Sequence, residues 1–234
     1  MTPAPFVIFG YNHFTCDIAE IIQARGDRVA RLVLNRAERQ IPGKPTLADW
    51  LGRQKELGRD QGVPPIECAQ DADFRPGAGE RFAMGFSGAG REPWVEGLRT
   101  RHGLTFETLV HPSAVVSRSA VLGEGCVVCA GAIVAAEVRV GAHVTLNRGC
   151  TIGHHAALAD YAVVQPGANL ASFVRVGRGA VVGVGASVIE DRVIGEYSRV
   201  AAGAAVIADV PPRTLVAGVP AQVKRQLEHP PAAP

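Results

Sequence analysis

An uninterrupted six-residue period governs the second half of the chain. From Val116 to Val206 every sixth residue is aliphatic, sixteen positions in all, with no insertion. The residue two places before each of them is small or β-branched, except at Arg192. The residue after each of them is often glycine, as at Gly123 and Gly153. This repeat limits the folds open to the chain more than any other feature.

A period of six fits neither an α-helix nor the alternation of a simple strand. It fits a triangular coil in which each flat wall uses six residues and three walls complete a turn. Each aliphatic residue then stacks on its equivalent 18 residues later, and the small residues fit where the walls converge. The glycines are expected to allow the sharp corners. The pattern predicts a hexapeptide-repeat parallel β-helix of about five coils.

The cysteines fit the same pattern. There are five, an odd number in no framework spacing, which indicates a reducing, cytoplasmic setting. The "CVVC" run from Cys126 to Cys129 looks like a redox or metal pair. However, Cys126 and Cys150 fall in the column of small residues. We expect them to be buried packing residues.

The first hundred residues have a different pattern, with strands expected at 4–10, 28–34, 81–86 and 104–110 and helices at 15–26, 46–57 and 90–103. A β-α-β order implies a right-handed parallel unit. We therefore expect a small Rossmann-like domain over 1–109, the β-helix over 110–225, and a disordered proline-rich tail over 226–234.

Two turns of the Rossmann-like domain are candidate ligand sites. The first, "GYNHFT", has one glycine, Gly10, and lacks the G-x-G-x-x-G fingerprint of a dinucleotide cradle. The second, "GFSGAGR" (85–91), contains Gly85, Ser87 and Arg91. Its backbone N–H groups and its guanidinium suit a phosphate or a carboxylate. A flexible turn with a solvated arginine is the alternative, and His13 is a further candidate in the same crevice.

Charge and hydropathy exclude some partners. The formal net charge is +2 and there is no polybasic run, so no nucleic-acid partner is expected. No apolar run is long enough to span a bilayer, and "PFVIFG" is too short for a signal-peptide core. These features favour a cytoplasmic protein with neither a nucleic-acid nor a membrane partner.

The stretch "NRGCTIGHHAALADY" (147–161) carries adjacent histidines, His154 and His155. An imidazole titrates near neutral pH, so the pair suggests acid–base or metal chemistry. Together with His143, the pair supplies three imidazoles, which is enough for a zinc site. But His143 and His154 are 11 residues apart and should lie on different faces of the coil, so we expect no metal.

Three segments carry a resemblance to a known family: "TLVHPSAVVSRSAVLGEGCVV", "LNRGCTIGHHAALADY" and "DVPPRTLVAGVPAQV". Together they resemble the sugar O- and N-acyltransferases of the sialic-acid O-acetyltransferase type, which include bacillosamine-pathway and perosamine acetyltransferases. The resemblance extends from Phe6 to about Val223. It implies a left-handed β-helix after a Rossmann-like domain, and a homotrimer with acetyl-CoA between neighbouring β-helices. It also implies an acceptor that is a sugar or a nucleotide-linked sugar.

The resemblance also implies residue roles. His154 matches the general base that accepts a proton from the attacking amine or hydroxyl, and Asn147 matches a second catalytic residue. A base that titrates near pH 7 suits that step, and a backbone N–H can stabilise the developing oxyanion. The implied coenzyme-binding residues are Gly183, Ala201, Gly203, Ala217, Gly218 and Pro220. The candidate substrate-binding residues are Gly10, His13, Gly85, Ser87, Arg91 and His155.

One departure from the family bears on the chemistry. The family usually has Asp or Glu directly after the base, whereas this chain has His155. Side-chain alternation predicts that His154 and His155 point to opposite sides of the wall. Asp160 or Glu137 is then a candidate replacement for the carboxylate. The alternatives are acyl transfer to an acceptor without a nucleotide, and a coenzyme-binding scaffold that has lost catalysis.

Overall fold

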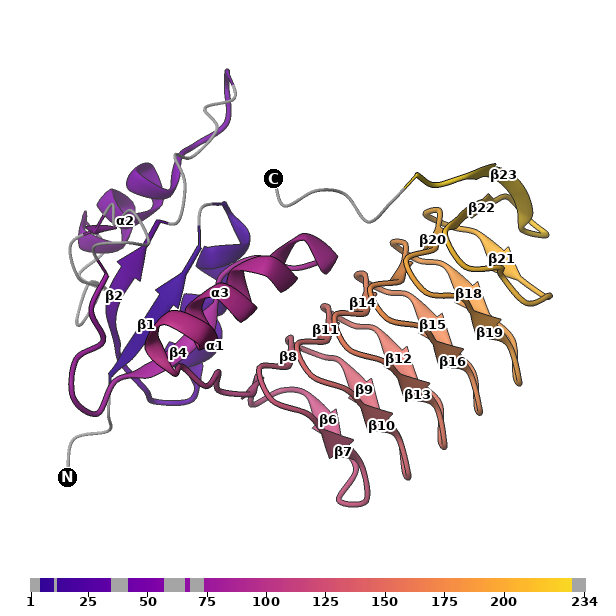
Figure 1. Ribbon diagram of the computed structural model, residues 1–234, viewed down its shortest axis with the longest axis horizontal. Helices are drawn as coiled ribbons and strands as arrows, with labels where there is room; N and C mark the ends of the chain where they lie inside the picture. The colour runs from indigo at the N-terminus through magenta and orange to yellow at the C-terminus, as the bar shows by residue number, and fades with distance from the viewer. Residues whose placement is uncertain (1–4, 11, 35–41, 57–65, 68–73, 229–234) are drawn as a thin grey trace. The chain divides into compact units, whose positions relative to one another are not determined.

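The computed structural model describes residues 5–10, 12–34, 42–56, 66–67 and 74–228. The chain divides into two compact units (Figure 1). The first comprises Met1–Phe86 with Glu96–Glu107, and the second comprises Ser87–Val95 with Thr108–Pro234. The glycine-rich turn is thus divided, with Gly85 in the first unit and Ser87 and Arg91 in the second. None of the described helices has the length and apolar character needed to cross a membrane.

The first unit contains a four-stranded parallel sheet in the order β3-β2-β1-β4. Its strands are β1 (Phe6–Phe9), β2 (Val29–Val33), β3 (Ile66–Glu67) and β4 (Arg81–Met84). The helices are α1 (Phe14–Ala24) and α2 (Leu47–Glu56), and α3 (Glu92–His102) has residues in both units. All four residues of β1 are buried, and α1 buries Ile18, Ile21 and Ile22 as its apolar spacing predicts.

Two features of the first unit differ from the sequence prediction. The strand β3 was not predicted. The strand expected over 104–110 is reduced to an isolated bridge between Phe82 and Phe106 and the two-residue strand β5 (Leu109–Val110). The backbone N–H of Glu107 still donates to Phe82 O, after which β5 pairs with the β-helix. The chain therefore leaves one sheet and enters the other within a few residues.

The second unit is a parallel β-helix with three walls, built from two-residue strands except for the last two strands of wall 1 (Figure 1). Wall 1 contains β5, β8 (Val127–Val128), β11 (Thr145–Leu146), β14 (Val163–Val164), β17 (Val181–Val182), β20 (Arg199–Val200), β22 (Thr214–Ala217) and β23 (Gln222–Gln226). Wall 2 contains β6 (Val115–Val116), β9 (Ile133–Val134), β12 (Thr151–Ile152), β15 (Asn169–Leu170), β18 (Ser187–Val188) and β21 (Ala205–Val206). Wall 3 contains β7 (Val121–Leu122), β10 (Arg139–Val140), β13 (Ala157–Leu158), β16 (Arg175–Val176) and β19 (Val193–Ile194).

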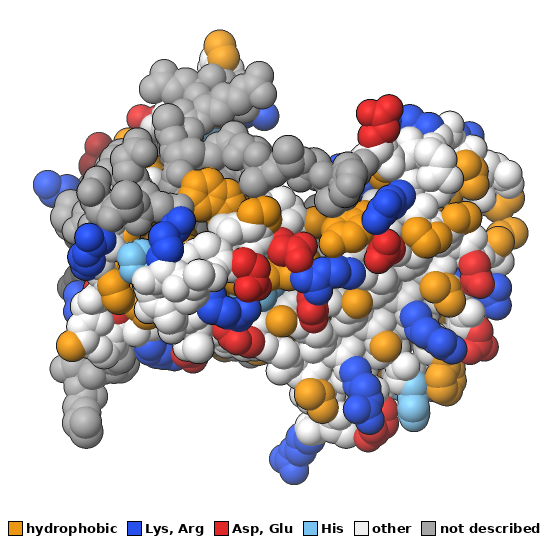
Figure 2. Space-filling model, viewed as in Figure 1, with side chains coloured by type: hydrophobic (Ala, Val, Ile, Leu, Met, Phe, Trp, Pro, Cys, Tyr) orange, Lys and Arg blue, Asp and Glu red, His pale blue; other side chains and the backbone are white. Residues whose placement is uncertain are grey.

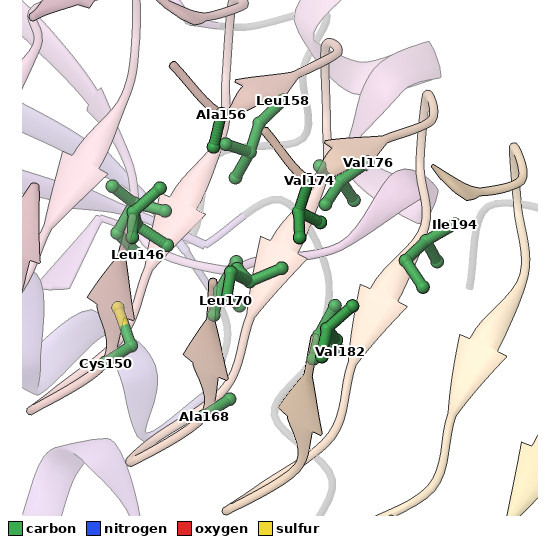
Figure 3. Close-up of a cluster of buried hydrophobic side chains, with 14 of the residues drawn as sticks. Leu146, Cys150, Ala156, Leu158, Ala168, Leu170, Val174, Val176, Val182 and Ile194 are labelled. Carbon is green, nitrogen blue, oxygen red and sulfur yellow. The ribbon is translucent and has the colours of Figure 1, made fainter. Parts of the chain in front are cut away.

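Strand pairing follows the predicted 18-residue register through the repeat, as in Thr145 opposite Val163, and shifts to 16 residues where β20 pairs with β22. The second residue of each repeat strand points inward, and the small residues fill the space between the walls (Figure 3). Cys126 and Cys150 lie in this core, where burial raises the pKa of their thiols to about 11 and about 12. The predicted β-helix and the packing role of these two cysteines are confirmed.

The expected role of the corner glycines was wrong. Gly123 and Gly153 do not have positive φ. A Cβ on Gly153 would instead lie 2.6 Å from the carbonyl carbon of Ala171 in the next coil. These glycines are favoured because adjacent coils pack closely. The left-handed position comes two residues later, where His155 has a φ of 60°.

The end of the β-helix extends further than the repeat. The strand β23 pairs antiparallel with β22 and ends at Gln226, the first residue of the expected tail. Most of that tail, residues 229–234, lies outside the described part of the chain.

Candidate functional site

The adjacent histidines lie in the turn that joins wall 2 to wall 3, between β12 and β13. We call this edge of the β-helix corner 2–3. Both side chains are exposed. The Nδ1 atoms of His154 and His155 are 3.1 Å apart, and the two rings are nearly perpendicular. The two imidazoles therefore form one hydrogen-bonded pair on the surface.

This contact overturns the prediction that the two histidines point to opposite sides of a wall. Alternation applies to residues within a strand, whereas both histidines lie in the turn after Ile152. The left-handed backbone of His155 directs its side chain back toward His154. The ring of Phe173, one coil later, stacks on His155 and presents its edge to His154.

Neither proposed replacement carboxylate contacts His154. Asp160 lies after β13, at the corner that joins wall 3 to wall 1, where it accepts hydrogen bonds from the Ala142 N–H and from Arg178, each at 2.8 Å. Glu137 precedes His155 by one coil at corner 2–3 and also has a left-handed backbone. The hydrogen-bond partner of His154 among the described side chains is His155.

A hollow of about 520 Å³ lies on wall 3, whose strand β13 begins at Ala157, two residues after His155. Arg139 and Arg175 line the hollow on the strands to either side of Ala157. Two strand spacings separate the arginine backbones by roughly 10 Å. Within the described chain, neither guanidinium has a carboxylate partner. Figure 2 shows basic, acidic and hydrophobic side chains interleaved on the exposed surface of the β-helix. The hollow therefore offers two available positive charges close to the imidazole pair.

Asn147 lies at another edge, the turn between wall 1 and wall 2, which we call corner 1–2. Its side-chain N–H donates to Gln165 Oε1 at 3.3 Å, and its Oδ1 accepts the Arg148 N–H at 2.9 Å. One wall of the coil separates it from His154, seven residues along the chain, which is a path of at most about 25 Å. Within one chain the structure does not bring the two expected catalytic residues together.

The expected coenzyme residues gather on the same edge as Asn147. Gly183 and Ala201 each follow a strand of wall 1 and Ala217 ends β22, so they stack above Asn147 and Gln165 at corner 1–2. Gly203, Gly218 and Pro220 lie close by in sequence and are exposed. This row of small residues leaves a smooth, accessible edge along the later coils.

The expected ligand turns of the first unit are closely packed. A Cβ on Gly10 would lie 2.1 Å from Thr15 Oγ1 and 3.1 Å from the Cα of Gly85. The hydroxyl of Thr15 donates to Gly85 O at 3.1 Å. Gly10 and Gly85 thus let the ends of β1 and β4 meet the start of α1. This close packing explains why both positions are glycine.

The amino end of α1 already has its hydrogen bonds. Phe14 N donates to the Asn12 side chain at 3.0 Å, and Thr15 N and Cys16 N donate to backbone carbonyls of Asn12 and His13. His13 itself is exposed and its Nε2 is hydrogen-bonded to Pro45 O, so that nitrogen carries the proton. The first turn of α1 therefore offers no free N–H among these three to a phosphate.

Arg91 is not available at the surface. Its side chain is fully buried in the second unit, and desolvation lowers the pKa of its guanidinium to about 10 despite nearby Cys126 and Tyr161. The expectation that Arg91 meets a ligand in an open crevice is therefore wrong for this conformation. Next to it, Glu92 is held by Arg178, which also bonds Asp160. Ser87, at the start of the same segment, is partly exposed.

His143 lies at the corner that joins wall 3 to wall 1, and not at corner 2–3. It is buried and stacks on Tyr161, with ring centroids 5.1 Å apart. This placement agrees with the different coil faces inferred from the 11-residue spacing.

Sequence reasoning missed Phe173, Arg139 and Arg175. Phe173 lies one coil after His155 in the repeat, so an 18-residue step from His155 identifies it. The same step from Ala157 reaches Arg175 forward and Arg139 backward. The register of the repeat thus contained the signal, in columns whose side chains face outward.

Comparison with solved structures finds the same fold over nearly the whole chain. Perosamine N-acetyltransferase (PerB) of Caulobacter crescentus, solved with CoA and GDP-perosamine, is 31% identical, with a TM-score of 0.72, over 94% of this chain and 97% of that chain. The acetyltransferase domain of PglB from Neisseria gonorrhoeae FA1090, in complex with acetyl coenzyme A, is 23% identical with a TM-score of 0.77, over 95% of this chain and 100% of that chain.

A third structure, WeeI from Acinetobacter baumannii AYE, is 16% identical with a TM-score of 0.70, over 94% of this chain and 99% of that chain. PglB and WeeI share the fold with this chain, while PerB also exceeds 30% identity. No protein-family model and no curated protein sequence matches the chain.

Proposed function

Because the chain belongs to the hexapeptide-repeat sugar acyltransferases, we propose that it transfers an acetyl group from acetyl-CoA to the amino group of a nucleotide-linked sugar. The observation that carries this proposal is the 31% identity, over 97% of its length, to an enzyme solved with CoA and GDP-perosamine. The exposed imidazole of His154 supplies a base of the kind this reaction needs.

In the proposed reaction the neutral amine of the acceptor attacks the thioester carbonyl. The C–N bond forms, the C–S bond breaks, and the proton lost by the amine passes to Nε2 of His154. That proton then leaves with the thiolate of CoA, which restores the base. Backbone N–H groups near the corner are suited to stabilise the oxyanion of the tetrahedral intermediate. His154 is exposed on a rigid coil, which favours a fixed position for the imidazole.

We propose that the active enzyme is a homotrimer. Asn147 and the row from Gly183 to Ala217 lie at corner 1–2, whereas His154 lies at corner 2–3. A neighbouring copy that places its corner 1–2 opposite corner 2–3 of the first would complete the site. Three copies related by a three-fold axis that lies outside the β-helix and faces wall 2 repeat this arrangement three times.

The coenzyme would then lie between wall 3 of one copy and corner 1–2 of the next. Arg139 and Arg175 line the hollow on wall 3 and suit the phosphates of the coenzyme. The small side chains at corner 1–2 suit close approach of its extended pantetheine arm. This role explains why two cations lie without carboxylate partners beside the base.

One observation favours a second candidate, transfer to an amino sugar without a nucleotide. The N–H groups of the first turn of α1 are already used by Asn12 and His13, and Gly10 packs on Gly85. The usual phosphate position of a parallel sheet is thereby closed in the described structure. An acceptor without phosphates would need no such position.

Mass spectrometry tests the proposal and separates the candidates. The purified full chain is incubated with acetyl-CoA and either GDP-, UDP- and dTDP-linked 4-amino sugars or the matching free amino sugars. Acetylation of a nucleotide-linked sugar supports the first candidate, and acetylation of the free sugars alone supports the second. Stoichiometric binding of acetyl-CoA without transfer to any acceptor would instead indicate a scaffold.

A further inference from the structure

The imidazole of His155 is held in place on several sides. Its backbone N–H donates to Ala136 O at 3.0 Å in the preceding coil. Phe173, in the following coil, stacks on its ring with a centroid distance of 5.0 Å and an interplanar angle of 24°. The Phe173 N–H also donates to His154 O at 3.1 Å, which ties the histidine turn to the turn of Phe173. Backbone and ring contacts together orient His155 toward His154.

The Nδ1–Nδ1 contact has two proton arrangements when both imidazoles are neutral. If His155 donates, then His154 must carry its own proton on Nε2 and cannot accept another there. If His154 donates from Nδ1, its Nε2 keeps a lone pair and can accept the proton of the acceptor amine. Only the second arrangement makes His154 a base at Nε2.

After proton uptake, the His154 cation still donates its Nδ1–H to the lone pair of His155. The imidazole of His155 therefore stabilises the cation and fixes the tautomer of His154. A carboxylate beside a catalytic histidine performs the same two tasks. A neutral imidazole performs them without a negative charge. In the described structure, neither imidazole has a different side-chain hydrogen-bond partner for this task.

We propose that His155 is the positioning residue of the base: as a neutral Nε2–H tautomer, it accepts the Nδ1–H of His154 and thereby keeps Nε2 of His154 free. The catalytic consequence of this inference rests on the proposed function. The assignment of the two tautomers does not depend on that function. Phe173 is the residue that holds His155 in this orientation.

The first test determines the tautomers directly and needs no sugar acceptor. The full chain is labelled with ¹⁵N-histidine, and the signals are assigned with His154→Gln and His155→Gln. In the neutral state, at alkaline pH, two-dimensional ¹⁵N spectra should show His154 protonated on Nδ1 and His155 protonated on Nε2. His154 protonated on Nε2 would overturn the inference while leaving acyl transfer itself untouched.

The second test uses substitutions matched in shape. The Oδ1 atom of Asn or Asp occupies the position of a histidine Nδ1, and Asn and Asp tolerate the left-handed backbone found here. The side chain introduced by His155→Leu has a similar volume but no hydrogen-bond acceptor atom. We expect His155→Leu to lower kcat about 10- to 100-fold with the KM for acetyl-CoA within about twofold. His155→Asn and His155→Asp should recover most of the loss.

The outcomes separate this inference from the proposed function. Wild-type kcat in His155→Leu, or equal losses in His155→Leu, His155→Asn and His155→Asp, would overturn the positioning role. The absence of acyl transfer by the wild-type chain to any acceptor would contradict the proposed function, whereas the spectroscopic test would still decide the tautomers.

Discussion

The ring of Phe173 stacks on the ring of His155, with centroids 5.0 Å apart, and belongs to the next coil of the β-helix. Phe173 is 46% exposed, so it contributes less to the core than a buried aromatic residue would. The contacts that distinguish Phe173 are therefore those of its ring with the rings of His154 and His155.

Replacing Phe173 should reduce catalysis more than stability. An aromatic contact contributes about 0.5–1.5 kcal/mol beyond its buried area. If that energy orients His155, Phe173→Ala should lower kcat roughly 2- to 10-fold with little change in the KM for acetyl-CoA. Phe173→Tyr keeps the ring and serves as the control. Steady-state kinetics on both variants test the effect, and equal kcat values for Phe173→Ala and wild type would refute it.

The two arginines of wall 3 should act on coenzyme binding. Arg139→Gln and Arg175→Gln should each raise the KM for acetyl-CoA about 3- to 30-fold with a smaller effect on kcat, because each removes a charge that faces a phosphate. Added salt should reduce the difference in the KM for acetyl-CoA between each variant and the wild type. Arg28→Gln, on the exposed surface of the first unit, makes the same change in net charge and is the control. Similar KM values for all three variants would argue against a coenzyme site on wall 3.

The column of small residues should limit side-chain size inside the β-helix. Ala168 has no exposed surface and lies one coil after Cys150. Ala168→Leu should therefore lower the free energy of unfolding by about 1–3 kcal/mol, whereas Cys150→Ala, which only removes volume, should cost about 1 kcal/mol. Thermal and denaturant unfolding measure both changes. A more stable Ala168→Leu variant would show that the walls are not closely packed there.

Acid should destabilise the first unit through Glu107. Two hydrogen bonds from Arg81, at 2.6 and 3.2 Å, hold the pKa of the Glu107 carboxyl below its ordinary value. A lowered folded-state pKa adds stability above the unfolded pKa, and this stability is lost as pH falls through the folded pKa. Unfolding measured from about pH 5 to pH 3 should show a smaller stability loss in Glu107→Gln than in wild type. Identical pH dependence in both proteins would contradict this linkage.

The repeat made the β-helix predictable, because one inward residue in six fixes both the wall and the register. It also located Cys126 and Cys150 in the core. The role of Gly153 was misjudged, because close packing between coils and a left-handed backbone both favour glycine, and the sequence does not separate them. The first unit was predicted less completely, since β3 has only two residues and no periodicity.

The candidate site was predictable in its residues but not in its contacts. The I-G-H motif identified His154, but no strand rule describes a turn, so the contact with His155 could not be inferred from alternation. Arg91 illustrates another limit. A glycine-rich turn that ends in arginine has the sequence of an anion site, while burial beside Cys126 and Tyr161 depends on the tertiary fold.

The central claim, that His154 is the base of an acyl transfer, is tested most directly by the kcat of His154→Gln. The reaction uses acetyl-CoA and the acceptor identified by mass spectrometry, and calorimetry measures acetyl-CoA binding to the same variant. The account predicts a loss in kcat of roughly 10²- to 10⁴-fold with coenzyme affinity nearly unchanged. A variant that keeps most of the wild-type kcat would contradict it.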